Sequence, residues 1–150
     1  MNTTYIIIFV AAAIAIFVLG RKKRKADPVP YTYTPANIHP SLEPYLLEII
    51  RAAVKFDKPI MIEDIQIKFG RTSNPKYLAE QQGNLIILHM NLMSATSDQL
   101  RFLVFHEVGH FLGLPHTDDP DDIMAPGGVS ATGKLSLDED TRIANFFDKL

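Results

Sequence analysis

The sequence predicts an α+β fold with a small mixed β-sheet, and three observations lead to this prediction. Apolar residues recur at helical spacing over residues 42–56. Two segments with the composition of strands, residues 61–69 and 85–90, follow this helix. A second helical pattern then runs from residue 97 toward Gly113.

Composition and charge limit the classes of protein that fit. The 150 residues are about one domain, and 47% of them are hydrophobic, which is typical of a folded chain. The absence of cysteine excludes disulfides, thiolate metal sites and cysteine nucleophiles. Five of the 15 basic residues lie in residues 21–25, so the rest of the chain carries 10 basic and 17 acidic residues. A body with this net charge of −7 argues against nucleic acid as a partner.

The N-terminal segment predicts a membrane anchor. Residues 1–20 carry no charged side chain, and as a helix they would span about 30 Å, the thickness of a bilayer's hydrocarbon core. The basic block at residues 21–25 follows the apolar run, whereas a cleaved signal peptide carries its positive charges before it. The positive-inside rule therefore predicts a single span with the N-terminus outside and the folded domain in the cytoplasm. A secreted or outward-facing protein is the alternative.

The predicted organisation has three parts. Residues 1–20 are the transmembrane anchor, which makes the lipid bilayer a partner of this segment. Residues 21–40 are a basic block and a linker whose four prolines favour an extended spacer. Residues 41–150 form the folded domain. The oligomeric state is not predicted.

Local signals justify the first helix and the two strands. Ser41 is suited to the N-cap of the helix over residues 42–56, and Pro44 falls in its first turn, where proline is tolerated. The apolar residues of segment 61–69 partly alternate, as in a half-buried strand. Segment 85–90 is continuously apolar, which indicates burial on both faces. The segment between them, residues 70–83, has turn residues and no clear period.

The helix that begins near residue 97 carries two candidate metal ligands. Thr96 or Ser97 can cap it, and Gln99 has capping-box spacing from Thr96. His106 and His110 lie four residues apart on this helix. Four residues turn a helix by about 400° and rise about 6 Å, so both imidazoles project from one face.

A third ligand and a candidate base complete a catalytic pattern. Gly113 can end the helix with a positive φ and turn the chain so that His116 approaches the other two histidines. Three neutral imidazoles leave one zinc position open for water, which is typical of a catalytic site. Glu107, next to His106, can take the proton of that water. The sequence therefore predicts one catalytic Zn²⁺.

Residues 106–116, HEVGHFLGLPH, resemble the HExxHxxGxxH motif of the metzincin zinc metallopeptidases, and the matrixin branch in particular. Met124 follows eight positions after His116, and the sequence DIMAP around it resembles the Met-turn of that family. Residues 135–150 resemble the C-terminal helix of matrixins. This resemblance implies a minimal metzincin-like catalytic domain over residues 41–150. It also implies that His106, His110 and His116 bind zinc, that Glu107 is the general base and that Met124 packs beneath the site.

The resemblance implies a zinc endopeptidase, in which Glu107 and a zinc-activated water hydrolyse a polypeptide substrate, and the pattern of residues 1–25 adds a membrane anchor to this prediction. Substrates of this family extend along an edge strand above the zinc helix, and residues 85–90 are the predicted strand here. The alternatives are a catalytically weak zinc-binding adaptor tethered to the membrane, a zinc hydrolase of a non-peptide amide or ester, and an anchored structural protein without zinc.

Predictions also follow for a histidine and an acidic loop outside the zinc motif. His89 is expected to be an ordinary strand residue and not a ligand. The loop after His116 holds Asp118, Asp119, Asp121 and Asp122. It could bind calcium through its hard carboxylate ligands, but a solvated loop that influences substrate choice is the favoured interpretation.

Overall fold

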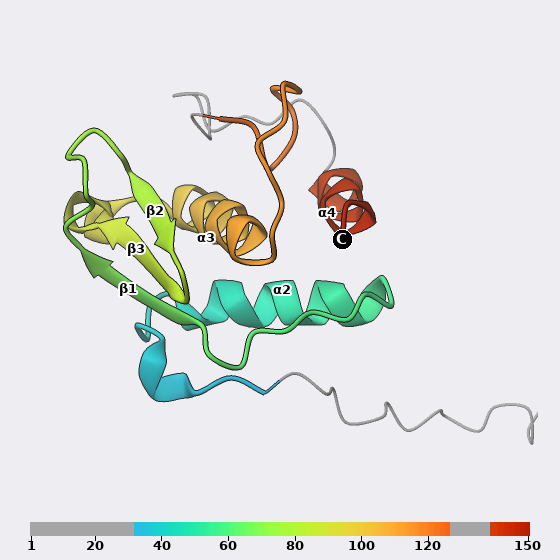
Figure 1. Cartoon of the computed structure of the whole chain (residues 1–150), viewed down its shortest axis with the longest axis horizontal. Helices are drawn as coiled ribbons and strands as arrows, with labels where there is room; N and C mark the ends of the chain where they lie inside the picture. Colours follow the sequence, from blue (N-terminus) through green and yellow to red (C-terminus); the bar gives the residue numbers. More distant parts are fainter. Residues whose placement is uncertain (1–31, 127–138) are drawn as a thin grey trace, which may run out of the picture. The chain divides into compact units, whose positions relative to one another are not determined.

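The structure is a computed structural model that describes residues 32–126 and 139–150 (Figure 1). The predicted anchor, residues 1–20, and most of the predicted linker lie outside the described residues. Across the part of the chain that is described, no helix is both long enough and apolar enough to cross a bilayer. Membrane anchoring and the three-part domain organisation therefore stay predictions.

The described residues combine helices with a three-stranded sheet, which confirms the α+β class. Helix α2 (Glu43–Lys55) buries one apolar face, whereas helix α3 (Ser97–Phe111) is buried on nearly all sides from Phe102 to Gly109, and the core forms where these helices and the small sheet meet. The elements are η1 (Pro35–Asn37), α2 (Glu43–Lys55), β1 (Gln66–Gly70), β2 (Ala79–Gln82), β3 (Leu85–His89), η2 (Met90–Ser94), α3 (Ser97–Phe111) and α4 (Glu139–Asp148).

The helix predicted over residues 42–56 is α2, but its start differs from the prediction. Leu42, not Ser41, is the N-cap residue, and no side chain caps the helix. The backbone N–H groups of Leu42 and Glu43 instead donate to the carbonyl oxygen of His39, at 2.8 and 3.2 Å. The Ser41 hydroxyl lies 2.9 Å from Nδ1 of His39. A turn of the preceding chain therefore replaces the predicted side-chain cap.

The sheet is mixed, as predicted, and its strand order is β1-β3-β2. β3 pairs in parallel with β1 and antiparallel with β2. The three central residues of β3, Ile86–Leu88, are buried. This confirms the burial that the continuous apolar run predicts. The prediction that residues 85–90 pair with a substrate is wrong, because both edges of this strand are already occupied.

The sheet differs from the sequence prediction in the start of its first strand and in one strand that was not predicted. The first strand begins at Gln66 and not at residue 61, since the preceding segment turns and places Ile62 and Ile65 in the core without a strand partner. β2 lies in the segment for which no element was predicted, because its sequence AEQQ has no apolar run. Gly83, with φ of +58°, makes the tight connection from β2 to β3 possible.

α3 lies between the sheet and α4 in Figure 1, and it contacts both. Phe146 and Phe147 of α4 are fully buried. The ring of Phe146 meets Phe105 of α3 edge-on at 5.9 Å between centroids, and Phe147 stacks on Phe56 at 5.8 Å. α4 thus closes the core on the side of α3 away from the sheet.

Candidate metal centre

The start and end of α3 position the histidines. The capping box predicted for Thr96 and Gln99 is present: the Thr96 hydroxyl accepts from Gln99 N, and the Gln99 side chain accepts from Thr96 N. At the other end Gly113 has a φ of +91°, as predicted. The chain reverses there, and Leu114 N donates to Gly109 O at 2.9 Å. This reversal returns the following residues to the face of α3 that carries the histidines.

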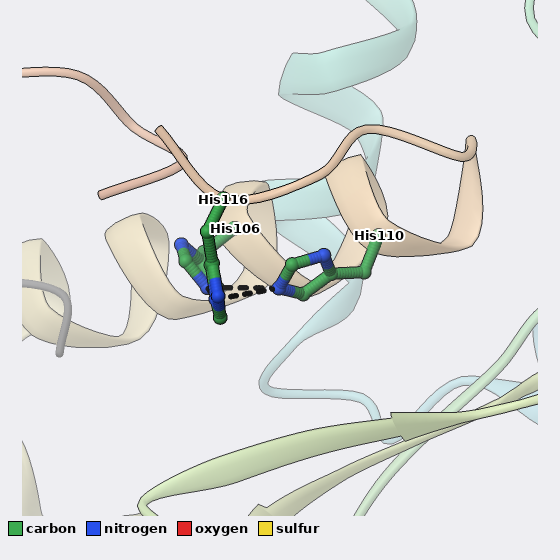
Figure 2. A group of neighbouring side chains, drawn as sticks. All are labelled: His106, His110 and His116. Carbon is green, nitrogen blue, oxygen red and sulfur yellow. Dashed lines mark hydrogen bonds between the residues drawn. The ribbon is translucent and has the colours of Figure 1, made fainter. Parts of the chain in front are cut away.

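The three histidines converge through their Nε2 atoms, as Figure 2 shows. The Nε2 atoms of His106 and His110 are 3.1 Å apart, and that of His116 is 3.3 Å from the first and 3.0 Å from the second. Within the described ranges, no other three histidine or acidic side chains bring their ligand atoms together in this way.

In two of the three rings, those of His106 and His110, the other nitrogen, Nδ1, is hydrogen-bonded to a backbone carbonyl. Nδ1 of His106 donates to the carbonyl of Ile123 at 2.7 Å, and Nδ1 of His110 donates to the carbonyl of Leu114 at 2.9 Å. A carbonyl can only accept, so in each neutral ring Nδ1 carries the proton and Nε2 carries a lone pair. Two lone pairs 3.1 Å apart do not form a hydrogen bond with each other. A cation shared between them would stabilise this arrangement.

Burial keeps these rings neutral. It lowers the pKa of His106 to about 4, although the bond to Ile123 opposes this shift. Burial also lowers the pKa of His110. Both rings are therefore uncharged at neutral pH, which is the state that binds a metal.

The donor set fits zinc. Nitrogen ligands at ~2.0–2.1 Å from a tetrahedral centre are about 3.3–3.4 Å apart. The observed Nε2 separations of 3.0–3.3 Å are close to that value. Three imidazoles, two of them with Nδ1 bound to a backbone carbonyl, are a typical catalytic zinc set, with a further position left for water.

Glu107 lies next to His106 on α3 and is also buried. Burial, together with the negative charge of Glu80 on β2, raises the pKa of its carboxyl to about 7. A buried acidic group of near-neutral pKa thus directly follows the candidate ligand His106 on α3.

Met124 is fully buried beneath α3. A Cβ atom added to Gly109 would overlap Sδ of Met124 and come within 2.8 Å of Cε2 of Phe146. Because Gly109 has no side chain, the loop that carries Met124 and helix α4 can approach α3 between His106 and His110. This role was not predicted from the sequence, although a glycine inside a helix, which costs about 1 kcal/mol relative to alanine, is a signal for it.

The loop after His116 was predicted to be solvated, but it is only partly exposed, and for Asp122 the prediction is wrong. Asp118 and Asp119 are exposed, but Asp122 is buried. Its Oδ1 accepts from Met124 N at 2.7 Å, and its Oδ2 forms an ion pair with Lys149. The carboxylate is used inside the protein, because it caps the turn that holds Met124.

His89 caps η2, since its Nδ1 accepts from Asn91 N at 3.2 Å. Its side chain is not part of the group of three converging histidines.

Comparison with known families agrees with this geometry. A family model described as matrixin matches residues 88–145. This segment of the chain is matrixin-like. It contains the three histidines, Glu107, Met124 and most of α4, and the match supports a zinc metallopeptidase family, with hydrolase chemistry and a polypeptide substrate. No curated protein and no solved structure matches the chain significantly.

Proposed function

We propose that this protein is a membrane-anchored zinc endopeptidase. The observation that carries the proposal is the convergence of three Nε2 atoms, two of them on rings whose Nδ1 atoms are held by backbone carbonyls. The matrixin match over residues 88–145 supports the assignment to peptide hydrolysis.

His106, His110 and His116 would hold the zinc ion. When bound, zinc supplies a Lewis acid that lowers the pKa of water and polarises a peptide carbonyl. Glu107 is the general base: its carboxylate takes the proton of the attacking water. The same group then gives this proton to the leaving amine, so the carboxylate is regenerated after each cycle.

The substrate strand in this proposal is β2, the edge strand next to α3. His89 N donates to Leu78 O at 2.8 Å, so the antiparallel register directs the backbone groups of residues 78, 80 and 82 toward β3. The backbone N–H and C=O groups of Ala79 and Gln81 then point to the free edge. An extended peptide can pair with them by strand addition.

The membrane assignment rests on the sequence pattern of residues 1–25. We propose a single span with the N-terminus outside and the catalytic domain in the cytoplasm. Protease protection of a C-terminal tag in intact cells tests this: protection supports the cytoplasmic domain, and digestion supports the outward-facing alternative.

The first test of the enzyme is zinc content of the full-length chain, purified in mild detergent, followed by screening on a peptide library. We expect about one zinc per chain, which His110→Ala loses, and peptide cleavage that Glu107→Ala abolishes without loss of zinc. Glu63→Ala, a change at an exposed carboxylate, is the matched control and should retain activity.

The possible results separate the alternatives. A folded chain without zinc, even when zinc is supplied, contradicts the whole proposal and favours an anchored structural protein. Zinc without hydrolysis of any peptide favours the tethered adaptor. Cleavage of non-peptide amides alone favours a different hydrolase, and unchanged turnover in Glu107→Ala contradicts the role of that residue.

A further inference from the structure

We propose that Lys149 and Arg142, two basic residues of the C-terminal segment, act as positioning residues for the metal ligand His106. Both hold the loop whose Ile123 carbonyl accepts from Nδ1 of His106. Arg142 also lies against the Phe102 ring, which stacks on His106. The inference rests on the proposed function, because it assumes that His106 binds zinc.

The first connection runs from Lys149 through Asp122. Nζ of Lys149 pairs with Oδ2 of Asp122, whose side chain is only 7% exposed. The other carboxylate oxygen, Oδ1, accepts from Met124 N at 2.7 Å. Ile123 lies between Asp122 and Met124 in the chain, and its carbonyl accepts from Nδ1 of His106 at 2.7 Å. Lys149 therefore contacts the turn that presents this carbonyl.

The second connection runs from Arg142 through Phe102. Nε of Arg142 donates to the carbonyl of Asp121, in the same loop. Its guanidinium carbon lies 5.8 Å from the centroid of the Phe102 ring, and that ring stacks on His106 at 6.1 Å with an interplanar angle of 25°. Arg142 thus reaches His106 both through the loop and through an aromatic ring.

Stability alone does not account for Arg142. Its side chain is 3% exposed, and Nη2 has no hydrogen-bond partner among the described residues. Burying a charge with an unsatisfied donor costs free energy, and an apolar side chain in this place would avoid that cost. A guanidinium that fixes both the loop and Phe102 has a geometric role that an apolar side chain could not fill.

The consequence concerns the direction of the His106 lone pair. A hydrogen bond to Nδ1 fixes the tautomer and the orientation of a metal-binding ring, and loss of such a partner typically weakens metal affinity 10–100-fold. Lys149 acts one step further from the ring, through the loop. We therefore expect its removal to weaken zinc binding about three- to tenfold, at or below the lower limit of that range.

The test compares Lys149→Met with Lys149→Arg in the full-length chain. The control is Lys55→Met, which breaks an ion pair between α2 and Asp140 of α4; both side chains of that pair are exposed. Zn²⁺ affinity is measured by chelator competition, and the visible absorption of the Co²⁺ form reports ligand geometry. Thermal unfolding of the metal-free variants measures any general loss of stability.

Lys149→Met should weaken Zn²⁺ binding and change the Co²⁺ spectrum, while Lys149→Arg restores both and Lys55→Met leaves both unchanged. Asp122→Asn should weaken Zn²⁺ binding about tenfold. Adding Lys149→Met to this variant should then have no further effect, because both changes break the same pair.

Unchanged affinity and spectra in Lys149→Met, with only the unfolding temperature lowered, would overturn the inference and leave a simple structural contact. That result differs from failure of the proposed function, in which the wild-type chain itself binds no Zn²⁺. Because Lys149 is 36% exposed, its variants should fold even where Asp122→Asn does not.

Discussion

His106 and Glu107 are neighbours in the chain, and burial shifts their pKa values in opposite directions. The pKa of His106 falls from 6.5 to about 4, so below pH 6.5 the unfolded chain binds the extra proton and the metal-free fold loses stability as pH falls. The pKa of Glu107 rises from 4.5 to about 7, so the folded state binds the extra proton and stability falls as pH rises through that range. Between pH 4.5 and 6.5 the two effects oppose each other.

Glu107→Gln should expose the effect of His106. In the metal-free variant, the free energy of unfolding should fall by roughly 3 kcal/mol between pH 6.5 and 4, since one pKa unit corresponds to about 1.4 kcal/mol. The wild-type chain should change much less over the same range. Urea unfolding at several pH values, with chelator present, measures both. Parallel pH profiles for the two proteins would contradict this prediction.

Gly109→Ala tests the packing beneath the histidines. The added methyl group would overlap Met124 and approach Phe146, and overpacking of this kind typically costs about 1–3 kcal/mol. On helix propensity alone, the same change would stabilise α3 by about 1 kcal/mol. Denaturant unfolding decides the sign: we expect destabilisation, and a more stable variant would show that Met124 moves aside freely.

At the scale of elements, α3 and β2 differ in how far sequence predicts them. α3 has local signals at both ends, the capping box at Thr96 and the positive φ at Gly113. β2 has no such pattern, because a four-residue edge strand with a polar sequence buries little apolar surface. Its position depends on pairing with β3, and this pairing is set by the whole sheet.

Gln81→Pro tests the free edge of β2. The N–H of this residue points away from β3 in the register, and proline is tolerated where an edge N–H is not used within the sheet. We expect zinc content to be retained and kcat/KM on peptides to fall about tenfold, the equivalent of one lost hydrogen bond. Gln82→Pro is the contrasting control, since its N–H faces β3 and its loss should destabilise the fold. Unchanged peptide cleavage in Gln81→Pro would remove β2 as the substrate strand.

At the scale of the whole molecule, a bound metal would connect α3 to the loop that carries His116. An ion that binds only the folded state stabilises it by mass action, by about 2.7 kcal/mol at a free concentration one hundred times Kd. A chelator should therefore lower the Tm of the wild-type chain and leave that of His116→Ala nearly unchanged. Equal chelator effects on both proteins would place the stabilising ion elsewhere.

The sequence by itself determined what depends on a few consecutive residues. These features are the helical spacing of His106 and His110, the capping box and the turn at Gly113, because helix geometry and backbone conformation act over one or two turns. The burial of β3 was predictable for the same reason, from an apolar run within one segment.

Only the tertiary structure decided which strand lies at the free edge and that Asp122 is buried against Lys149. It also decided that Gly109 lies where Met124 and Phe146 meet α3. Each of these contacts joins residues far apart in the chain, so no local pattern records it. Pairing of β3 with both other strands decides the free edge. The physical cause of the other two contacts is the packing of α4 and the loop that carries Met124 against α3, which buries side chains whose sequence context is that of a solvated loop or an ordinary helix.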